Sequence, residues 1–163
     1  MARLTKFGGT DGATLTVTLT EGIPIDERDY GSKQIFTIPA IVDITRRLVT
    51  VTTTEAVIAT FAAAVGPGAY IAADVMYMRF TNIDDTNFIT LTFRNQDNDE
   101  VAIKLDAGKS IILCGDNNGG MADIFNATED ADAASDTNLG DLTNIQADAN
   151  SASVDIEMYI ACK

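Results

Sequence analysis

The residues of this chain that could do chemistry are mainly carboxylates. The 163 residues include 24 Asp and Glu but no His. Without an imidazole there is no Ser-His or Cys-His pair, and no histidine is available to bind a metal. The serines show neither a Gly-x-Ser-x-Gly elbow nor a Ser-x-x-Lys pair, and no Gly-x-x-x-x-Gly-Lys-Ser/Thr phosphate loop is present. The sequence therefore lacks the common nucleophilic and phosphate-binding motifs.

The carboxylates gather in segments that read as turns. Oxygen-rich loops of this kind can bind Ca²⁺, but none has the Gly and closing Glu of an EF-hand loop. A glycosidase-type carboxylate pair would need a cleft that raises the pKa of one acid. We predict solvated loop acids, no catalytic, cofactor-binding or metal-ligating residues, no cofactor and no enzymatic activity. The clusters are Asp84-Asp85, Asp97 to Glu100, Asp116-Asn117-Asn118, and Glu129-Asp130 with Asp132 and Asp136.

Aromatic and sulfur side chains give weaker signals. The chain has no Trp, so a sugar would have to stack on tyrosine, and Tyr30 and Tyr70 are the two tyrosines in expected loops. Cys114 and Cys162 have no zinc-site spacing, and each ends an apolar alternating run. We expect both to be buried, reduced thiols.

Composition excludes several classes of protein. The net charge of −13 argues against nucleic acid as a partner, because affinity for phosphates depends mainly on Lys and Arg. The longest apolar stretch, residues 56–65, is too short for a membrane helix, and residues 1–9 lack the apolar region of a signal peptide. We therefore expect neither a membrane nor a nucleic-acid partner. Residues 115–156 contain no basic side chain, so one face should be strongly acidic.

Most of the chain alternates apolar and polar residues with a period of two, which is typical of half-buried β-strands. About nine or ten such runs, separated by turns, predict an all-β fold, an antiparallel, jelly-roll-like β-sandwich. We expect one domain over residues 1–163 with a short N-terminal arm over about residues 1–12. The expected strands lie near residues 14–20, 35–44, 48–53, 75–80, 89–94, 101–105, 110–114 and 154–161.

Four local features need separate interpretation. Residues 54–65 fit a helix by propensity, but the surrounding pattern favours a strand, which we predict. Pro39 should break its run or place it at a sheet edge. Residues 105–109 read as a hairpin turn with Gly108 in the left-handed region, which would make the neighbouring strands a meander. Within residues 115–152 we expect short elements near 121–125 and 142–147.

Three segments of the second half carry a family resemblance. They are residues 77–91, with the turn Thr81-Asn82-Ile83-Asp84, residues 101–113, and residues 155–161. Together they resemble small all-β virion structural proteins of tailed bacteriophages, of the marine and cyanophage type. The resemblance implies a jelly-roll-like sandwich in a phage particle. Its motifs are structural turns, so it implies no catalytic residue.

The resemblance and the composition together give an expected function. We expect a non-enzymatic virion structural protein, most simply a capsid decoration or cement protein that stabilises the shell. Its partners would be the major capsid protein or other virion proteins and further copies of itself, for example in a trimer. It would be made in the host cytoplasm and reside in the virion. Two alternatives stay open: a tail, fibre or neck component, and a carbohydrate-binding β-sandwich module.

Overall fold

The computed structural model describes residues 12–64, 66–114, 120–121 and 142–163, and these residues are almost entirely β. The chain divides into two compact units, residues 1–43 with Lys163, and residues 44–162. The expected arm over about residues 1–12 and the expected element near 121–125 fall almost wholly outside the described residues. The single domain expected over residues 1–163 stays a prediction. The boundary between the two compact units falls after Asp43.

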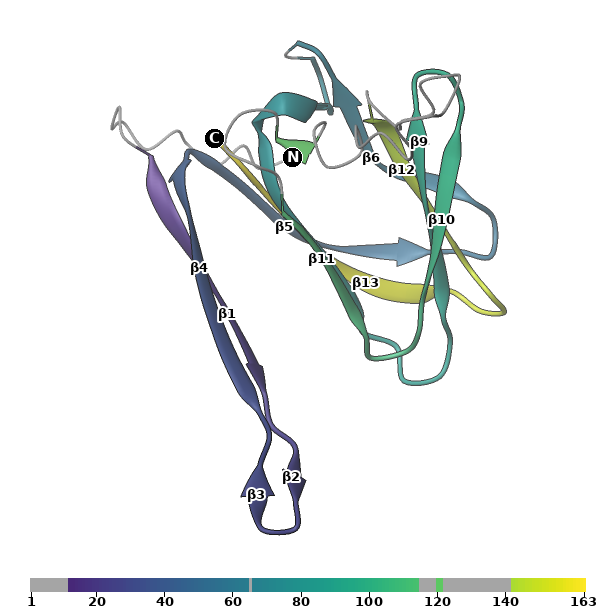
Figure 1. The fold of residues 1–163 in the computed structure, drawn as a ribbon. Helices are drawn as coiled ribbons and strands as arrows, with labels where there is room; N and C mark the ends of the chain where they lie inside the picture. Colours follow the sequence, from purple (N-terminus) through teal and green to yellow (C-terminus); the bar gives the residue numbers. More distant parts are fainter. Residues whose placement is uncertain (1–11, 65, 115–119, 122–141) are drawn as a thin grey trace, which may run out of the picture. The chain divides into compact units, whose positions relative to one another are not determined.

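The first unit is a long β-hairpin (Figure 1). Strands β1 (Ala13–Glu21) and β4 (Ser32–Ile41) pair in antiparallel fashion, and β2 (Pro24–Ile25) pairs with β3 (Arg28–Asp29) at the tip. The register sets Val17 opposite Phe36 and Leu15 opposite Ile38. Since facing residues share a side, one face of the ribbon is apolar and the other is rich in Thr.

Backbone conformation explains both ends of the hairpin. At the tip, Asp26 and Glu27 have φ of 49° and 65°, as a two-residue type I′ turn requires. At the base, a bulge between Ile38 and Ile41 contains Pro39, and β4 pairs only with β1, so the expected edge position of this proline is confirmed. Gly12 is required there, because a Cβ on it would lie 2.6 Å from the carbonyl carbon of Ala40.

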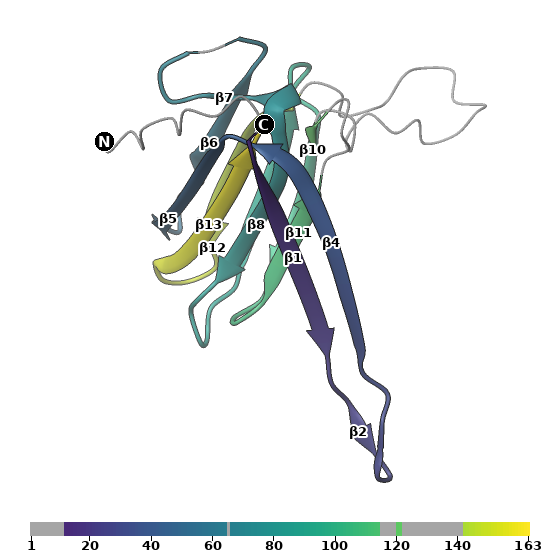
Figure 2. The same ribbon diagram turned by 90° about the vertical axis from the view of Figure 1, so that its left-hand side faces the viewer.

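The second unit contains two sheets (Figures 1 and 2). The four-stranded sheet has the order β11-β8-β13-β5, and the five-stranded sheet has the order β10-β9-β12-β6-β7. Most successive strands alternate between the sheets, which confirms the predicted sandwich and is compatible with a jelly roll. The strands are β5 (Asp43–Val51), β6 (Ala56–Ala62), β7 (Tyr70–Ile71), β8 (Val75–Asn82), β9 (Ile89–Asn95), β10 (Glu100–Leu105), β11 (Ser110–Cys114), β12 (Leu142–Ala149) and β13 (Val154–Cys162), with a 3₁₀ turn at Ala72–Asp74.

The core forms from the apolar faces of both sheets. In β13, alternate residues starting at Val154 are fully buried, as the sequence pattern predicts. Burying each large apolar side chain stabilises the fold by about 1.5–3 kcal/mol relative to leaving it exposed. The largest fully buried side chains include Phe80, Phe93, Met78, Leu91, Ile145 and Met158.

Two local expectations have clear outcomes. The ambiguous segment 54–65 contains strand β6, so the strand prediction is confirmed. The meander prediction is confirmed for β9 and β10, which pair across the loop after Asn95, and is wrong for the strands before and after them. Gly108 does adopt a φ of 67°, and the Lys109 amide donates to the Asp106 carbonyl at 3.1 Å, but this turn links β10 to β11 in the other sheet. A local turn signal cannot distinguish a hairpin from a corner between sheets.

The expectation for residues 142–147 is also met, since they lie in β12. Among the described residues, no helix has the length and apolar character needed to span a bilayer.

Candidate functional site

The first predicted acidic cluster serves a tight turn. The Asp84 Oδ1 atom accepts hydrogen bonds from the backbone amides of Thr86 at 2.8 Å and Asn87 at 2.6 Å. These backbone hydrogen bonds hold the pKa of Asp84 below its ordinary value. A general acid needs the opposite shift, so Asp84 is set up as a structural carboxylate.

Asp84 also borders an open hollow of about 410 Å³. Asp155 lies on the same hollow, and its Oδ1 atom accepts a hydrogen bond from the Thr50 hydroxyl at 2.6 Å. Both carboxylates therefore have protein partners. Thr50, Ile83 and Ser153 complete the lining of the hollow.

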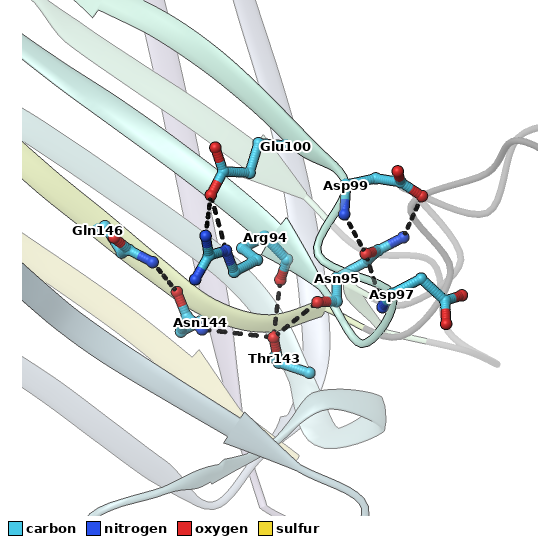
Figure 3. A network of polar contacts seen from close by, with 8 residues as sticks. All are labelled: Arg94, Asn95, Asp97, Asp99, Glu100, Thr143, Asn144 and Gln146. Carbon is cyan, nitrogen blue, oxygen red and sulfur yellow. Dashed lines mark hydrogen bonds and ion pairs between the residues drawn. The ribbon is translucent and has the colours of Figure 1, made fainter.

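The second predicted cluster, residues 97–100, is organised by one amide (Figure 3). The Asn95 Oδ1 atom accepts from the backbone amides of Asp97 at 2.9 Å and Asp99 at 2.7 Å, and its Nδ2 donates to Asp99 Oδ2 at 3.1 Å. Glu100 pairs with Arg94 at 2.6 Å. The Asn95 side chain therefore holds this loop in shape, and Asp99 is the one acid of the loop whose carboxylate it contacts. No group of three or more potential metal ligands occurs in the described parts of the chain. The clusters at 116–118 and 129–136 lie outside those parts.

Sequence reasoning missed the two buried asparagines that end β8 and β9. Asn82 is fully buried and Asn95 is 3% exposed. Each accepts a hydrogen bond from the backbone amide two residues later, at Asp84 and at Asp97, which is an Asx turn. The repeated Asn-x-Asp pattern after an apolar strand was the available signal.

The outer face of the four-stranded sheet carries a charge cluster. Glu157 accepts hydrogen bonds from both Arg46 and Arg79. The hydrogen bond from Arg46 is the main reason that the pKa of Glu157 lies below its ordinary value. The Arg79 guanidinium also lies 5.9 Å from the centre of the Tyr159 ring, and Tyr77 meets that ring edge-on. Two cations around one carboxylate leave this patch with excess positive charge on a strongly acidic chain.

The predicted sugar platform is not assembled within either unit. Tyr30 lies near the hairpin tip and is 62% exposed. Tyr70 is half-buried in the second unit, where its ring packs 5.9 Å from that of Phe61. The two tyrosines belong to different units.

The two cysteines are half-buried, where the sequence predicted buried thiols, and they form no disulfide. Cys114 stands opposite Tyr77 in the register of β11 and β8. Burial raises the pKa of the Cys114 thiol, which favours its protonated form.

The clearest surface feature is the outer half of the hairpin, residues 19–35, here called the distal hairpin. Its large apolar side chains are exposed by 41–62%. They line both faces of the ribbon, since Leu19 lies on the apolar face and Ile35 pairs with Thr18 on the other face. Several exposed apolar side chains on one short ribbon indicate a surface that binds a partner. These residues are Leu19, Ile23, Ile25, Tyr30 and Ile35.

Comparisons with known proteins give little further information. No family model matches the chain, and no curated protein matches it. Among solved structures, the chain is similar to one from the Bacillus endospore appendages, which form a family of disulfide-linked pili. The identity is 11%, the TM-score is 0.44, and the alignment covers 100% of this chain and 98% of the other. The fold assignment therefore rests on the strand pairing described above.

Proposed function

We propose that this protein is a non-enzymatic structural subunit of a tailed-phage particle that decorates or cements the capsid. The observation that carries the proposal is the distal hairpin, which presents exposed apolar side chains on a two-stranded ribbon. An isolated two-stranded ribbon is marginally stable in water, so a partner that covers it would stabilise both the ribbon and the contact.

The sandwich supports this role as a rigid body. Its core residues are almost fully buried, and no buried side-chain polar atom of the described chain lacks a hydrogen-bond partner. Its described acidic loops are held by backbone amides that donate to the Asp84 carboxylate in one loop and to the Asn95 amide oxygen in the other. The assignment to a phage particle comes from the resemblance of residues 77–91, 101–113 and 155–161.

The alternatives lead to different measurements. A tail, fibre or neck component would use the same hairpin, and would differ in the number of copies per particle. A carbohydrate-binding module would need an aromatic platform, and Tyr70 is engaged with Phe61.

Quantitative mass spectrometry of gradient-purified virions tests the proposal. A decoration protein should be present at the copy number of the major capsid protein or a simple fraction of it, whereas about a dozen copies would indicate the tail or neck. Absence from purified virions would refute the particle role.

Two variants test whether the exposed apolar side chains of the distal hairpin attach the protein to the particle. Changing Ile25 and Tyr30 to Ser should lower occupancy on the particle severalfold. Val101→Thr is the matched control, because it removes a 42% exposed apolar side chain from the sandwich and should leave occupancy unchanged. Equal occupancy of both variants would show that the distal hairpin does not attach the protein to the particle.

A further inference from the structure

The hairpin is longer than its own sandwich is wide. Residues 13–26 rise by about 45 Å at ~3.3 Å per residue. The four-stranded sheet spans about 14 Å at ~4.8 Å between strands, and its strands have at most nine residues, or about 30 Å. Whatever the placement of the two units, one sandwich face cannot cover the whole hairpin. The large apolar side chains of the distal hairpin are exposed in the structure, so a second molecule can bury them.

The chemistry of the distal hairpin restricts that second molecule. Glu21 accepts a hydrogen bond from Ser32, and Asp29 accepts hydrogen bonds from the backbone amides of Ile23 and Gly31. Asp26 and Glu27 at the turn are exposed, and their side chains form no hydrogen bond or ion pair with other described residues. The partner surface should therefore combine apolar side chains with a cation.

The outward side of β5 offers this combination. Ile44, Arg46 and Leu48 follow one another at every second residue, so they share a face. Ile44 is 39% and Leu48 is 65% exposed, and the Arg46 side chain is 68% exposed even though it pairs with Glu157. Because Arg79 also binds Glu157, Arg46 can meet a second carboxylate. As an edge strand, β5 also leaves one side of its backbone unpaired within its sheet.

We propose that the distal hairpin of one copy docks on the β5 surface, Ile44, Arg46 and Leu48, of a second copy. Apolar side chains of the tip cover Ile44 and Leu48, and the Glu27 carboxylate pairs with Arg46. The inference rests on the proposed structural function and names the partner of the hairpin within it.

One docked hairpin buries too little area for a stable interface. Each copy must therefore dock its own hairpin on a partner and bind a partner's hairpin on its β5 surface. A ribbon about 27 Å long and 10 Å wide covers on the order of 300 Å² on each partner. One such contact is well below the ~800 Å² per partner of a stable interface. A two-fold pair with both contacts buries about 1,200 Å² in total, the lower limit of that class, and a closed ring also uses every hairpin.

Sedimentation of the purified full-length chain tests this proposal through a charge exchange. Arg46→Glu and Glu27→Lys should each weaken self-association roughly tenfold or more, because each places like charges at the contact. The double variant should restore association. Lys104→Glu is the control, since it makes the same type of charge change on β10 and should leave association unchanged. A thermal melt of each variant verifies folding.

Each outcome has a distinct meaning. Wild-type protein that stays monomeric while occupying virions would overturn the second copy as partner and leave the particle role intact. Self-association that ignores Arg46→Glu would overturn the β5 surface. A monomer whose melting temperature drops in both single variants and recovers in the double variant would show that the hairpin docks on its own chain. Charge-dependent association of a protein absent from virions would refute the particle role and support the docking.

Discussion

Replacing Asn82 by Asp should be among the most damaging single-atom changes available in this chain. The Asn82 Nδ2 atom donates to the carbonyl of Asn87 at 2.8 Å and to that of Leu105 at 3.2 Å, while its Oδ1 atom accepts from the Asp84 amide. Asn82→Asp keeps the size and the acceptor. It replaces the donor by an oxygen that faces two carbonyl oxygens in a fully buried position.

The magnitude follows from those contacts. Each of the two lost hydrogen bonds contributes about 0.5–1.5 kcal/mol, and an unsatisfied buried polar group costs about 1–3 kcal/mol. We expect the free energy of unfolding at neutral pH to fall by about 3–5 kcal/mol, a large part of the ~5–15 kcal/mol of a typical domain.

The loss should also depend on pH. Burial and the facing carbonyls raise the pKa of the introduced carboxyl above its unfolded value of about 3.9. The protonated form can donate one hydrogen bond, so the variant is least impaired below about pH 4. It loses further stability as pH rises through the folded pKa.

Urea unfolding followed by circular dichroism at acidic and neutral pH measures both effects. Asn150→Asp is the control, because it makes the same substitution at an exposed position. There we expect the free energy of unfolding to change by less than about 0.5 kcal/mol. Equal losses in the two variants, or a loss below about 1 kcal/mol at Asn82, would refute this hydrogen-bond accounting.

Two further predictions concern the charge cluster and the hairpin tip. Because the folded pKa of Glu157 is lowered, its pairing stabilises the protein above the unfolded pKa of about 4.3, and that stability is lost as pH falls through the folded pKa. An NMR titration of Glu157 should show the lowered pKa. Glu157→Gln should reduce the loss of stability at acidic pH. An unchanged loss of stability at acidic pH in this variant would contradict the role of Glu157. Gly31→Ala should open the tip, because its Cβ would lie 2.0 Å from the Glu21 carbonyl oxygen, whereas a Cβ at Gly22 meets nothing within 4 Å. Hydrogen exchange at the Tyr30 amide, which donates to the Ile23 carbonyl, should rise in Gly31→Ala and stay unchanged in Gly22→Ala; equal rates would contradict the steric reasoning.

Strands could be predicted from the sequence because burial alternates along them. Val154 to Ile160 alternate in the structure as they do in the sequence. Their assignment to sheets could not be predicted in this way. Gly108 supports the same local turn whether the next strand pairs with the previous one or crosses to the opposite sheet. That choice depends on the packing of residues far apart in the chain.

The candidate site was harder to predict for a related reason. Leu15, Val17 and Leu19 alternate as in a strand with one buried face, yet Leu19 is 41% exposed. A periodic pattern identifies an apolar face but not the molecule that covers it. The roles of Asn82 and Asn95 were hidden because asparagine usually marks an exposed turn, and only the fold shows that these two are enclosed.

The strand order also determines when this protein can fold. The last two strands of the chain, β12 and β13, are inner strands of their sheets: β12 lies between β9 and β6, and β13 lies between β8 and β5. The five-stranded sheet cannot close until residue 149 has been synthesised, and the four-stranded sheet cannot close until residue 162. The hairpin, whose pairing is local, can form while the sandwich strands still have unpaired edges. Folding should therefore be slow and late, as expected for distant strand pairing, and the unpaired edges of a nascent chain are open to aggregation until then.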